Sequence, residues 1–152
     1  MIFDQESILE KVSLILSANE GKDQTLKSIT KLLTEEVFHY DWVGFYFLDD
    51  NKSNLRLGPY TGASTEHTLI PVGKGVCGQV AQSGQPLVVQ DVTQIENYLS
   101  CSLHVQSEIV VPILKDGKFV AEIDIDSHAP APFTEADISL LEQVAMRLVK
   151  FF

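Results

Sequence analysis

The stretch SEIVVPILKDGKFVAEIDIDS, residues 107–127, decides how this chain folds. It holds two apolar runs, 109–114 and 119–125, on either side of Asp116-Gly117. An Asp-Gly pair between two such runs is typical of the two-residue turn that joins antiparallel strands. The stretch therefore predicts a β-hairpin, around which a larger sheet can form.

The second strand of this hairpin carries three carboxylates on one face. Side chains alternate along a strand, so Glu122, Asp124 and Asp126 point the same way, with about 7 Å between successive members. Taken alone, the pattern favours the solvated acidic face of an edge strand. The competing interpretation is a polar pocket, and the rest of the chain has to decide between the two.

The place of Glu108 depends on the register of the hairpin. An ideal two-residue turn pairs Ile109 with Asp124, and this register puts Glu108 on the opposite face from Asp124 and Asp126. Glu108 joins the other carboxylates if Pro112 forces a β-bulge or if Glu108 belongs to the preceding loop. Otherwise Glu108 does not share the pocket.

Another predicted strand, 42–48, carries the pattern Trp42-x-Gly-x-Tyr46. Alternation places Trp42, Gly44 and Tyr46 on one face, so a residue without a side chain lies between two large rings. This pattern predicts a recess between aromatic walls, which carboxylates facing it would make suitable for an ammonium group. The alternative is that the rings belong to the ordinary core.

Helices are predicted at both ends of the chain. Apolar residues at helical spacing predict helices over 5–18 and 23–38, and Thr134 with an acidic first turn predicts a last helix that runs to the C-terminus. The remaining predicted elements are strands at 55–60, 68–72 and 87–90, a short helix at 76–82 and an irregular connection at 91–103. Because most strands are linked as hairpins, we expect one α+β domain, 1–152, with N-terminal and C-terminal helices covering a largely antiparallel central sheet.

Composition limits the classes of partner. The net charge is −10, from 21 acidic residues against 11 Lys and Arg, and no basic block could neutralise phosphates, so we expect no nucleic acid partner. No apolar run approaches the roughly 20 residues of a membrane helix, and the N-terminus lacks a basic signal start, so we expect no membrane partner and a cytoplasmic protein. In that reducing compartment the two cysteines are not needed as a framework, so they either fill the core or carry chemistry.

Cys77 lies in the segment Gly-Lys-Gly-Val-Cys-Gly, residues 73–78. The segment matches the glycine pattern of dinucleotide-binding proteins, but the helix after it is too short for a parallel crossover, so we interpret it as a glycine turn into a helix. A thiol in the first turn of a helix beside Lys74 has a lowered pKa if it is exposed. The alternative is that Cys77 packs under the helix as a small apolar residue.

Cys101 lies in the irregular connection, where thiols are usually accessible. Such a cysteine can form a sulfenic acid and then a disulfide with a second cysteine. Cys77 and Cys101 with His67 and His104 could instead be zinc ligands, but their spacing matches no compact zinc motif. We therefore expect no metal and no other cofactor.

Several motifs together resemble a known family. They are Trp42-Val-Gly-Phe-Tyr, Leu57-Gly-Pro-Tyr, Ile70-Pro-Val-Gly-Lys-Gly-Val-Cys-Gly, Ser107-Glu-Ile-Val-Val-Pro, Ile123-Asp-Ile-Asp-Ser and the helix start Phe133-Thr-Glu-Ala-Asp. From about Asp41 to the C-terminus, the chain resembles the GAF domain family, most closely its free methionine-(R)-sulfoxide reductases. The resemblance implies a GAF-like α+β fold and a thiol-dependent reduction of free methionine-(R)-sulfoxide.

The resemblance also implies a role for each candidate site residue. It puts the catalytic cysteine on Cys101, which becomes a sulfenic acid, and the resolving cysteine on Cys77, which closes a disulfide that a thioredoxin-like reductant reopens. The implied substrate pocket consists of Trp42, Tyr46, Glu108, Asp124 and Asp126.

Two positions depart from the pattern of these reductases. His67 stands where they commonly carry a third cysteine, and Ser102 stands where an Asp is usual. GAF domains at large bind small molecules, so the alternative function is a ligand-binding or redox-sensing module without turnover. Helix pairs in this family often form dimers, and the apolar stripe of the N-terminal helix would suit a homodimer.

Overall fold

An antiparallel sheet forms the centre of the computed structural model, which describes residues 3–95 and 104–152. Its strands are β1 (Trp42–Leu48), β2 (Asn54–Thr61), β3 (Leu69–Pro71), β4 (Leu87–Val89), β5 (Ser107–Lys115) and β6 (Lys118–Ser127). The sheet has six strands in the order β3-β2-β1-β6-β5-β4, and every neighbouring pair runs antiparallel. The hairpin and the antiparallel sheet predicted from the sequence are confirmed, and β1 and β6 lie at the middle of the sheet.

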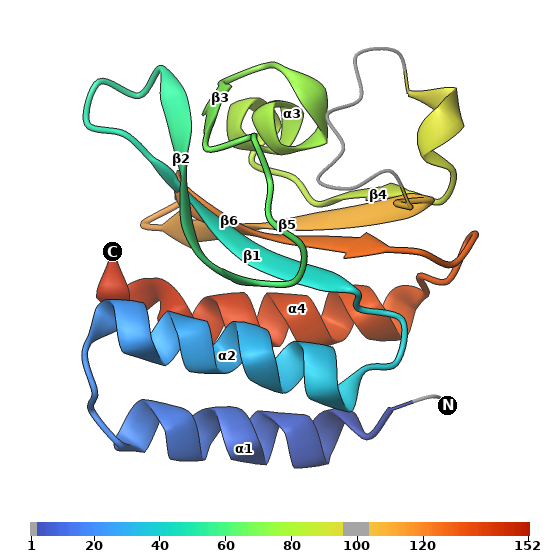
Figure 1. Ribbon diagram of the computed structural model, residues 1–152. Helices are drawn as coiled ribbons and strands as arrows, with labels where there is room; N and C mark the ends of the chain where they lie inside the picture. The colour runs from blue at the N-terminus through green and yellow to red at the C-terminus, as the bar shows by residue number, and fades with distance from the viewer. Residues whose placement is uncertain (1–2, 96–103) are drawn as a thin grey trace.

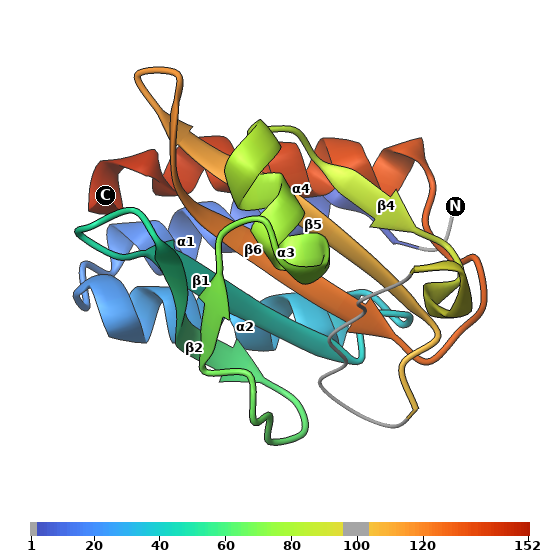
Figure 2. The same ribbon diagram turned by 90° about the horizontal axis from the view of Figure 1, so that it is seen from above.

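Helices cover both faces of this sheet. The helices α1 (Gln5–Ser17), α2 (Lys22–Glu36) and α4 (Glu135–Leu148) lie on one side, where α2 and α4 pack on the sheet and α1 packs beneath them as an outer layer (Figure 1). The helix α3 (Gly75–Ser83) lies on the opposite side (Figures 1 and 2). Two short 3₁₀ turns are η1 (Val92–Gln94) and η2 (Val149–Phe151). Among the helices in the described residues, none has both the length and the apolarity to cross a bilayer.

The larger core lies between the sheet and the three helices of the first side. Apolar side chains of α1, α2 and α4 meet one face of β1, β5 and β6, and buried examples are Leu26, Val43, Ile123 and Leu141. This burial supplies most of the driving force for folding, because each such side chain contributes about 1.5–3 kcal/mol when it leaves water.

A buried polar network fixes the start of α4 within this core. Thr134 and Asp137 form a capping box, in which the Thr134 backbone N–H donates to Asp137 Oδ2 at 2.8 Å. Asp137 Oδ1 accepts hydrogen bonds from His39 Nε2 at 2.7 Å and from the Tyr40 hydroxyl at 2.8 Å. Burial works against ionisation of Asp137, but these hydrogen bonds lower its pKa below 3.8. The predicted cap at Thr134 is confirmed, and Asp137 links it to the segment before β1.

A smaller core lies between α3 and the other face of the sheet. Its buried members include Trp42, Tyr46, Cys77 and Val110. The helix approaches the sheet edge closely at Gly78, where a Cβ atom would lie 2.6 Å from the carbonyl oxygen of Pro71. The last glycine of the 73–78 segment therefore allows close packing of α3, in agreement with its interpretation as a turn into a helix.

The register of the hairpin differs from that of an ideal two-residue turn. Ile113 pairs with Ala121 while Leu114 pairs with Phe119, so the ladder has an irregularity between Ile113 and Leu114, one residue after Pro112. The extra residue of β6 shifts every later pair by one position. Glu108 therefore lies opposite Asp126, within β5, which brings it to the face of the other carboxylates.

Candidate functional site

The candidate site is built from side chains on the α3 face of the sheet. Residues directly opposite each other on neighbouring strands share a face, and three cross-strand rows result. These rows are Trp42–Asp126–Glu108, Gly44–Asp124–Val110 and Tyr46–Glu122–Pro112. Four carboxyl groups and two aromatic rings are thus grouped on one face.

All four carboxyl groups are buried. Glu108 is 3% exposed, Glu122 is 0% exposed, and Asp124 and Asp126 are each 1% exposed. The interpretation of an acidic edge strand in water is therefore wrong, because β6 lies between β1 and β5 in the middle of the sheet and α3 covers this face. The competing interpretation, a polar cluster inside the protein, describes the observed arrangement.

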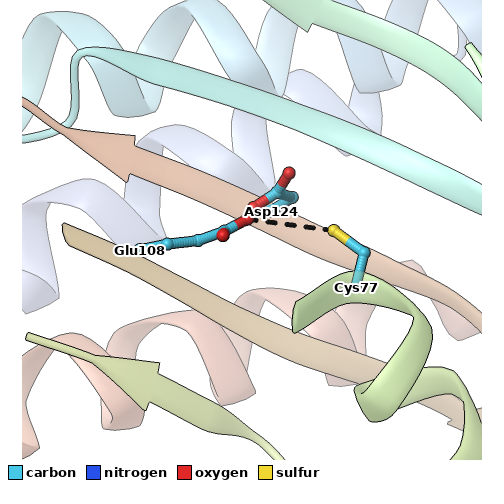
Figure 3. Close-up of side chains that lie close together, drawn as sticks. All are labelled: Cys77, Glu108 and Asp124. Atoms are coloured by element: carbon cyan, nitrogen blue, oxygen red, sulfur yellow. Dashed lines mark hydrogen bonds between the residues drawn. The ribbon is translucent and has the colours of Figure 1, made fainter. Parts of the chain in front are cut away.

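Cys77 of α3 faces this carboxyl cluster. Its Sγ atom lies 3.9 Å from Glu108 Oε2 and acts as a hydrogen-bond donor to it. One ligand atom each from Cys77, Glu108 and Asp124 lies within 4.8 Å of the other two. Figure 3 shows these three side chains converging from α3, β5 and β6. Cys77 is buried, as the second alternative predicted, but it borders polar groups as well as the apolar core.

Burial and neighbouring acidic groups favour the protonated forms of the Cys77 thiol and of carboxyl groups in the cluster. Burial, together with the nearby carboxyl groups of Asp124, Glu122 and Glu108, raises the pKa of the Cys77 thiol well above 9.0. The lowered pKa expected for an exposed helix-start thiol does not occur, because α3 turns Cys77 inward. Burial and the charge of Asp124 raise the pKa of Glu122 well above 4.5, and burial also raises the pKa of Asp124.

Two of the carboxyl groups have oxygen atoms that are not satisfied. Neither oxygen of Glu122, nor Oδ1 of Asp124, forms a hydrogen bond of ordinary geometry in the part of the chain that the structure describes, although the Cys77 thiol is close enough to Glu122 to interact with it. Leaving a buried polar atom unsatisfied costs about 1–3 kcal/mol, and more for a charged group. A site with such a cost is suited to a ligand that brings donors or positive charge.

Trp42 fills the space that the sequence predicted to be a recess. The indole lies over Gly44, where a Cβ atom would be only 2.3 Å from Trp42 Cη2. The ring stacks on Tyr60 at a centroid distance of 5.3 Å, and its Nε1–H donates to the carbonyl oxygen of Ala63 at 2.9 Å. Gly44 therefore makes room for the indole itself, and the ring forms one side of the buried cluster.

Tyr46 connects the cluster to the segment between β2 and β3. The Tyr46 hydroxyl donates a hydrogen bond to the carbonyl oxygen of His67 at 2.8 Å. His67 is therefore tied to the site through its backbone. Within the described residues, the group of three or more metal-ligand side chains is Cys77, Glu108 and Asp124, and neither His67 nor His104 belongs to it.

The structure places six of the seven predicted site residues. Trp42, Tyr46, Cys77, Glu108, Asp124 and Asp126 lie on the α3 face or point toward it. Cys101 lies outside the described residues. Glu122 shares the face and was not in the predicted site, although its alternation with Asp124 and Asp126 was visible in the sequence.

The sequence of the chain is similar to that of known proteins with a GAF domain. The family model of the GAF domain matches residues 22–150. The free methionine-R-sulfoxide reductase of Escherichia coli is 35% identical over 126 residues, which cover 83% of this chain and 74% of that protein. The GAF domain-containing protein A of Dictyostelium discoideum is 34% identical over 139 residues, or 91% of this chain and 86% of that protein.

A solved structure gives a similar comparison in three dimensions. The free methionine-R-sulfoxide reductase of Neisseria meningitidis, in complex with its substrate, is 35% identical and superposes with a TM-score of 0.88. The superposition covers 97% of this chain and 87% of that one. The α+β fold predicted from the sequence is confirmed at this level.

Proposed function

This chain belongs to the GAF domain family, and from that membership we propose that it reduces free methionine-(R)-sulfoxide to methionine. The observation that carries the proposal is the buried cluster in which the Cys77 thiol faces the carboxyl groups of Glu108 and Asp124. Relatives about one third identical to the chain are named free methionine-R-sulfoxide reductases, and one was solved with its substrate.

The cluster suits a small amino acid as substrate. Free methionine sulfoxide carries an α-ammonium group, which the carboxyl groups of Glu108, Asp124 and Asp126 can hold through charge-assisted hydrogen bonds. Trp42 and Tyr46 supply aromatic faces for the methyl sulfoxide end and for the cation. A peptide-bound methionine sulfoxide lacks the free ammonium group, so this pocket favours the free amino acid.

The first chemical step is an oxygen transfer to Cys101. The Cys101 sulfur attacks the sulfoxide sulfur, the sulfur–oxygen bond of the substrate breaks, and the oxygen ends on Cys101 as a sulfenic acid. A carboxylic acid of the cluster protonates the oxygen as it leaves the substrate sulfur. Methionine sulfoxide is reduced to methionine by two electrons, and Cys101 loses the same two electrons as it becomes a sulfenic acid.

The second step returns the enzyme to its reduced state. The Cys77 sulfur attacks the sulfenic acid, a disulfide forms between Cys77 and Cys101, and water leaves with the sulfenic oxygen. A thioredoxin-like dithiol then exchanges with this disulfide and restores both thiols. This sequence needs no metal or organic cofactor, and it takes place in a reducing compartment, for which we propose the cytoplasm.

A coupled assay tests the proposal directly. The protein is mixed with thioredoxin, thioredoxin reductase and NADPH, and NADPH oxidation is followed with the free R epimer, the free S epimer and a peptide-bound sulfoxide. We expect turnover with the free R epimer and little with the other two substrates. Absence of NADPH oxidation with the free R epimer would refute the proposed function.

Two cysteine variants separate the chemical steps. Cys101→Ser is expected to abolish methionine formation entirely. Cys77→Ser is expected to release about one methionine per chain and then stop, leaving a sulfenic acid on Cys101 that a dimedone-type reagent traps. Steady turnover by Cys77→Ser with thioredoxin would show that Cys77 does not resolve the sulfenic acid.

The second candidate function is a sensor that binds a small molecule without converting it. The buried state of Cys77 and its raised pKa favour this function, because such a thiol is not reactive at rest. A sensor predicts that free methionine-(R)-sulfoxide raises the melting temperature and is recovered unchanged, even after long incubation with reductant. Methionine in the recovered ligand would exclude it.

A further inference from the structure

The carboxyl cluster next to Cys77 has the composition of a metal site. One sulfur atom and two carboxylate oxygens, from Cys77, Glu108 and Asp124, lie within 4.8 Å of one another. The three residues come from separate elements, and each is buried. The arrangement therefore does not depend on an exposed loop or on the motion of a surface side chain.

A separate observation indicates that the cluster can hold a cation. Glu122 is 0% exposed, both of its oxygens are without a hydrogen-bond partner in the described residues, and its carboxyl group interacts with the Cys77 thiol. Oδ1 of Asp124 is likewise without a partner there. Buried charges are normally paired or bound to a metal, so a cation is the simplest group that would satisfy these atoms.

The distances fit a tetrahedral ion of moderate size. Zinc binds sulfur at about 2.3 Å and carboxylate oxygen at about 2.0–2.2 Å, which puts a tetrahedral sulfur–oxygen pair about 3.5–3.7 Å apart. The Cys77 Sγ to Glu108 Oε2 distance is 3.9 Å, so a shift of a few tenths of an ångström would bring this pair to the zinc geometry. The Asp124 oxygen lies within 4.8 Å of both atoms and would move closer as the ion binds.

The ligand types select among the available cations. Magnesium and calcium prefer oxygen ligands only, and a thiolate makes this set a poor site for either of them. Zinc accepts sulfur and carboxylate oxygen together in four-coordinate sites. The set also favours a cation over an anion, because every group in it is acidic.

We propose that Cys77, Glu108 and Asp124 form a zinc-binding site, with the buried carboxyl group of Glu122, which interacts with the Cys77 thiol, supporting it. The ion holds Cys77 as a thiolate and occupies the carboxylates that the proposed function assigns to the substrate. Zinc is then a reversible inhibitor of the proposed reductase, one that blocks both substrate binding and the attack by Cys77. The binding itself does not depend on the proposed function.

Cobalt provides a spectroscopic test with the metal alone. The reduced protein, freed of metal by a chelator, is titrated with Co²⁺, and the near-ultraviolet spectrum is followed. We expect a sulfur-to-cobalt charge-transfer band that saturates at about one ion per chain and disappears when Zn²⁺ is added. Absence of the band in the wild-type protein would overturn the inference without any variant.

Matched variants then identify the ligands. Competition with a chromophoric chelator measures the zinc affinity of each variant. We expect this affinity to fall at least about tenfold in four variants: Cys77→Ser, Glu108→Gln, Asp124→Asn and Glu122→Gln. Loss of a group that only supports a metal ligand already lowers metal affinity about 10–100-fold. The three amide variants keep the shape of the side chain, so they test the site even if Cys77→Ser does not fold. Cys101→Ser is the control and keeps wild-type affinity; loss of binding only in Cys101→Ser would refute the ligand set.

Surface histidines are the competing source of zinc binding. The rings of His104 and His128 lie 5.9 Å apart, and the His128 side chain is 49% exposed. We expect a His104→Ala and His128→Ala double variant to keep the cobalt band and the high-affinity equivalent of zinc. Loss of both in that variant would assign the binding to the surface pair.

The outcomes also separate this inference from the proposed function. A protein that binds zinc through Cys77 but never forms methionine keeps the metal site and refutes the reductase. A protein that reduces free methionine-(R)-sulfoxide with a rate unaffected by one equivalent of Zn²⁺ keeps the reductase and refutes the metal site. Affinity for zinc should also fall as the pH is lowered, because protons compete for the thiolate and the carboxylates.

Discussion

Replacing Asp137 with Asn is the sharpest test of the network that fixes the start of α4. The two carboxylate oxygens of Asp137 accept different hydrogen bonds. Oδ1 accepts hydrogen bonds from His39 Nε2 and the Tyr40 hydroxyl, and Oδ2 accepts one from the Thr134 backbone N–H. Asparagine has one acceptor oxygen. Whichever way its amide turns, its NH₂ group faces donors on the other side.

The magnitude follows from which bonds are lost. If the Asn oxygen stays with His39 and Tyr40, the variant loses the cap at about 1 kcal/mol and the helix-dipole charge at about 0.3–1 kcal/mol. It also loses the charge assistance of the two remaining bonds, since hydrogen bonds to a charged acceptor are worth about 1.5–3 kcal/mol against about 1 for neutral ones. We therefore expect Asp137→Asn to lower the free energy of unfolding by about 2–6 kcal/mol.

The effect depends on pH in a defined direction. The hydrogen bonds at Asp137 lower its pKa in the folded state below 3.8, so its ionised form stabilises the fold. This stabilisation is fully present above pH 3.8 and is lost as the pH falls through the folded-state pKa. The difference in the free energy of unfolding between the wild-type protein and Asp137→Asn should therefore become smaller at acidic pH.

Urea unfolding followed by tryptophan fluorescence measures the effect. Trp42 is the single tryptophan and is 2% exposed, so its emission reports global unfolding from the opposite face of the sheet. Glu135→Gln, which removes an exposed acidic residue of the same helix turn, is the control and should cost no more than about 1 kcal/mol. An Asp137→Asn effect equal to that of the control would refute the reasoning.

Two further substitutions test how the site is held. Gly78→Ala adds a Cβ atom 2.6 Å from the carbonyl oxygen of Pro71, so α3 must shift. We expect the free energy of unfolding in urea to fall by about 1–3 kcal/mol and turnover to slow. Wild-type stability would show that α3 packs less closely. Tyr46→Phe removes the 2.8 Å hydrogen bond to the His67 carbonyl oxygen and should lower the free energy of unfolding by about 1 kcal/mol, which corresponds to a fall of about 2–4 °C in the melting temperature. An unchanged melting temperature would count against this hydrogen bond.

Periodicity in the sequence was sufficient to predict the helices and strands of the fold, but not that α1 forms an outer layer or that α3 lies on the opposite face (Figure 1). The hairpin around Asp116-Gly117 and the helices at both ends follow from local patterns, and each lies within a few residues of its predicted position. The cap at Thr134 was predicted for the same reason. Local patterns did not indicate the hydrogen bonds of Asp137 with His39 and Tyr40, because these two residues lie about a hundred residues away along the chain.

The candidate site was predicted in part, and the missing information was tertiary. Alternation put Asp124 and Asp126 on one face, but the strand order decides whether that face is solvated, and strand order cannot be deduced from one hairpin. The register of Glu108 depends on an irregularity beside the turn, which the Asp-Gly pair does not specify. Glycine at position 44 correctly indicated space, and the side chain of Trp42 occupies it.

The burial of Cys77 explains why, in the proposed reaction, Cys77 reacts after Cys101. That reaction needs a proton donor when the sulfoxide oxygen leaves and a proton acceptor when the Cys77 thiol attacks the sulfenic acid. One buried carboxyl group can serve both steps, because it becomes a carboxylate after the first, and Glu108 Oε2 already lies 3.9 Å from the thiol. Before substrate is reduced, burial and the surrounding acids keep the thiol protonated by raising its pKa. A resolving cysteine controlled in this way reacts only after Cys101 has been oxidised, so an unreactive resting thiol agrees with the proposed sequence of steps as well as with a sensor.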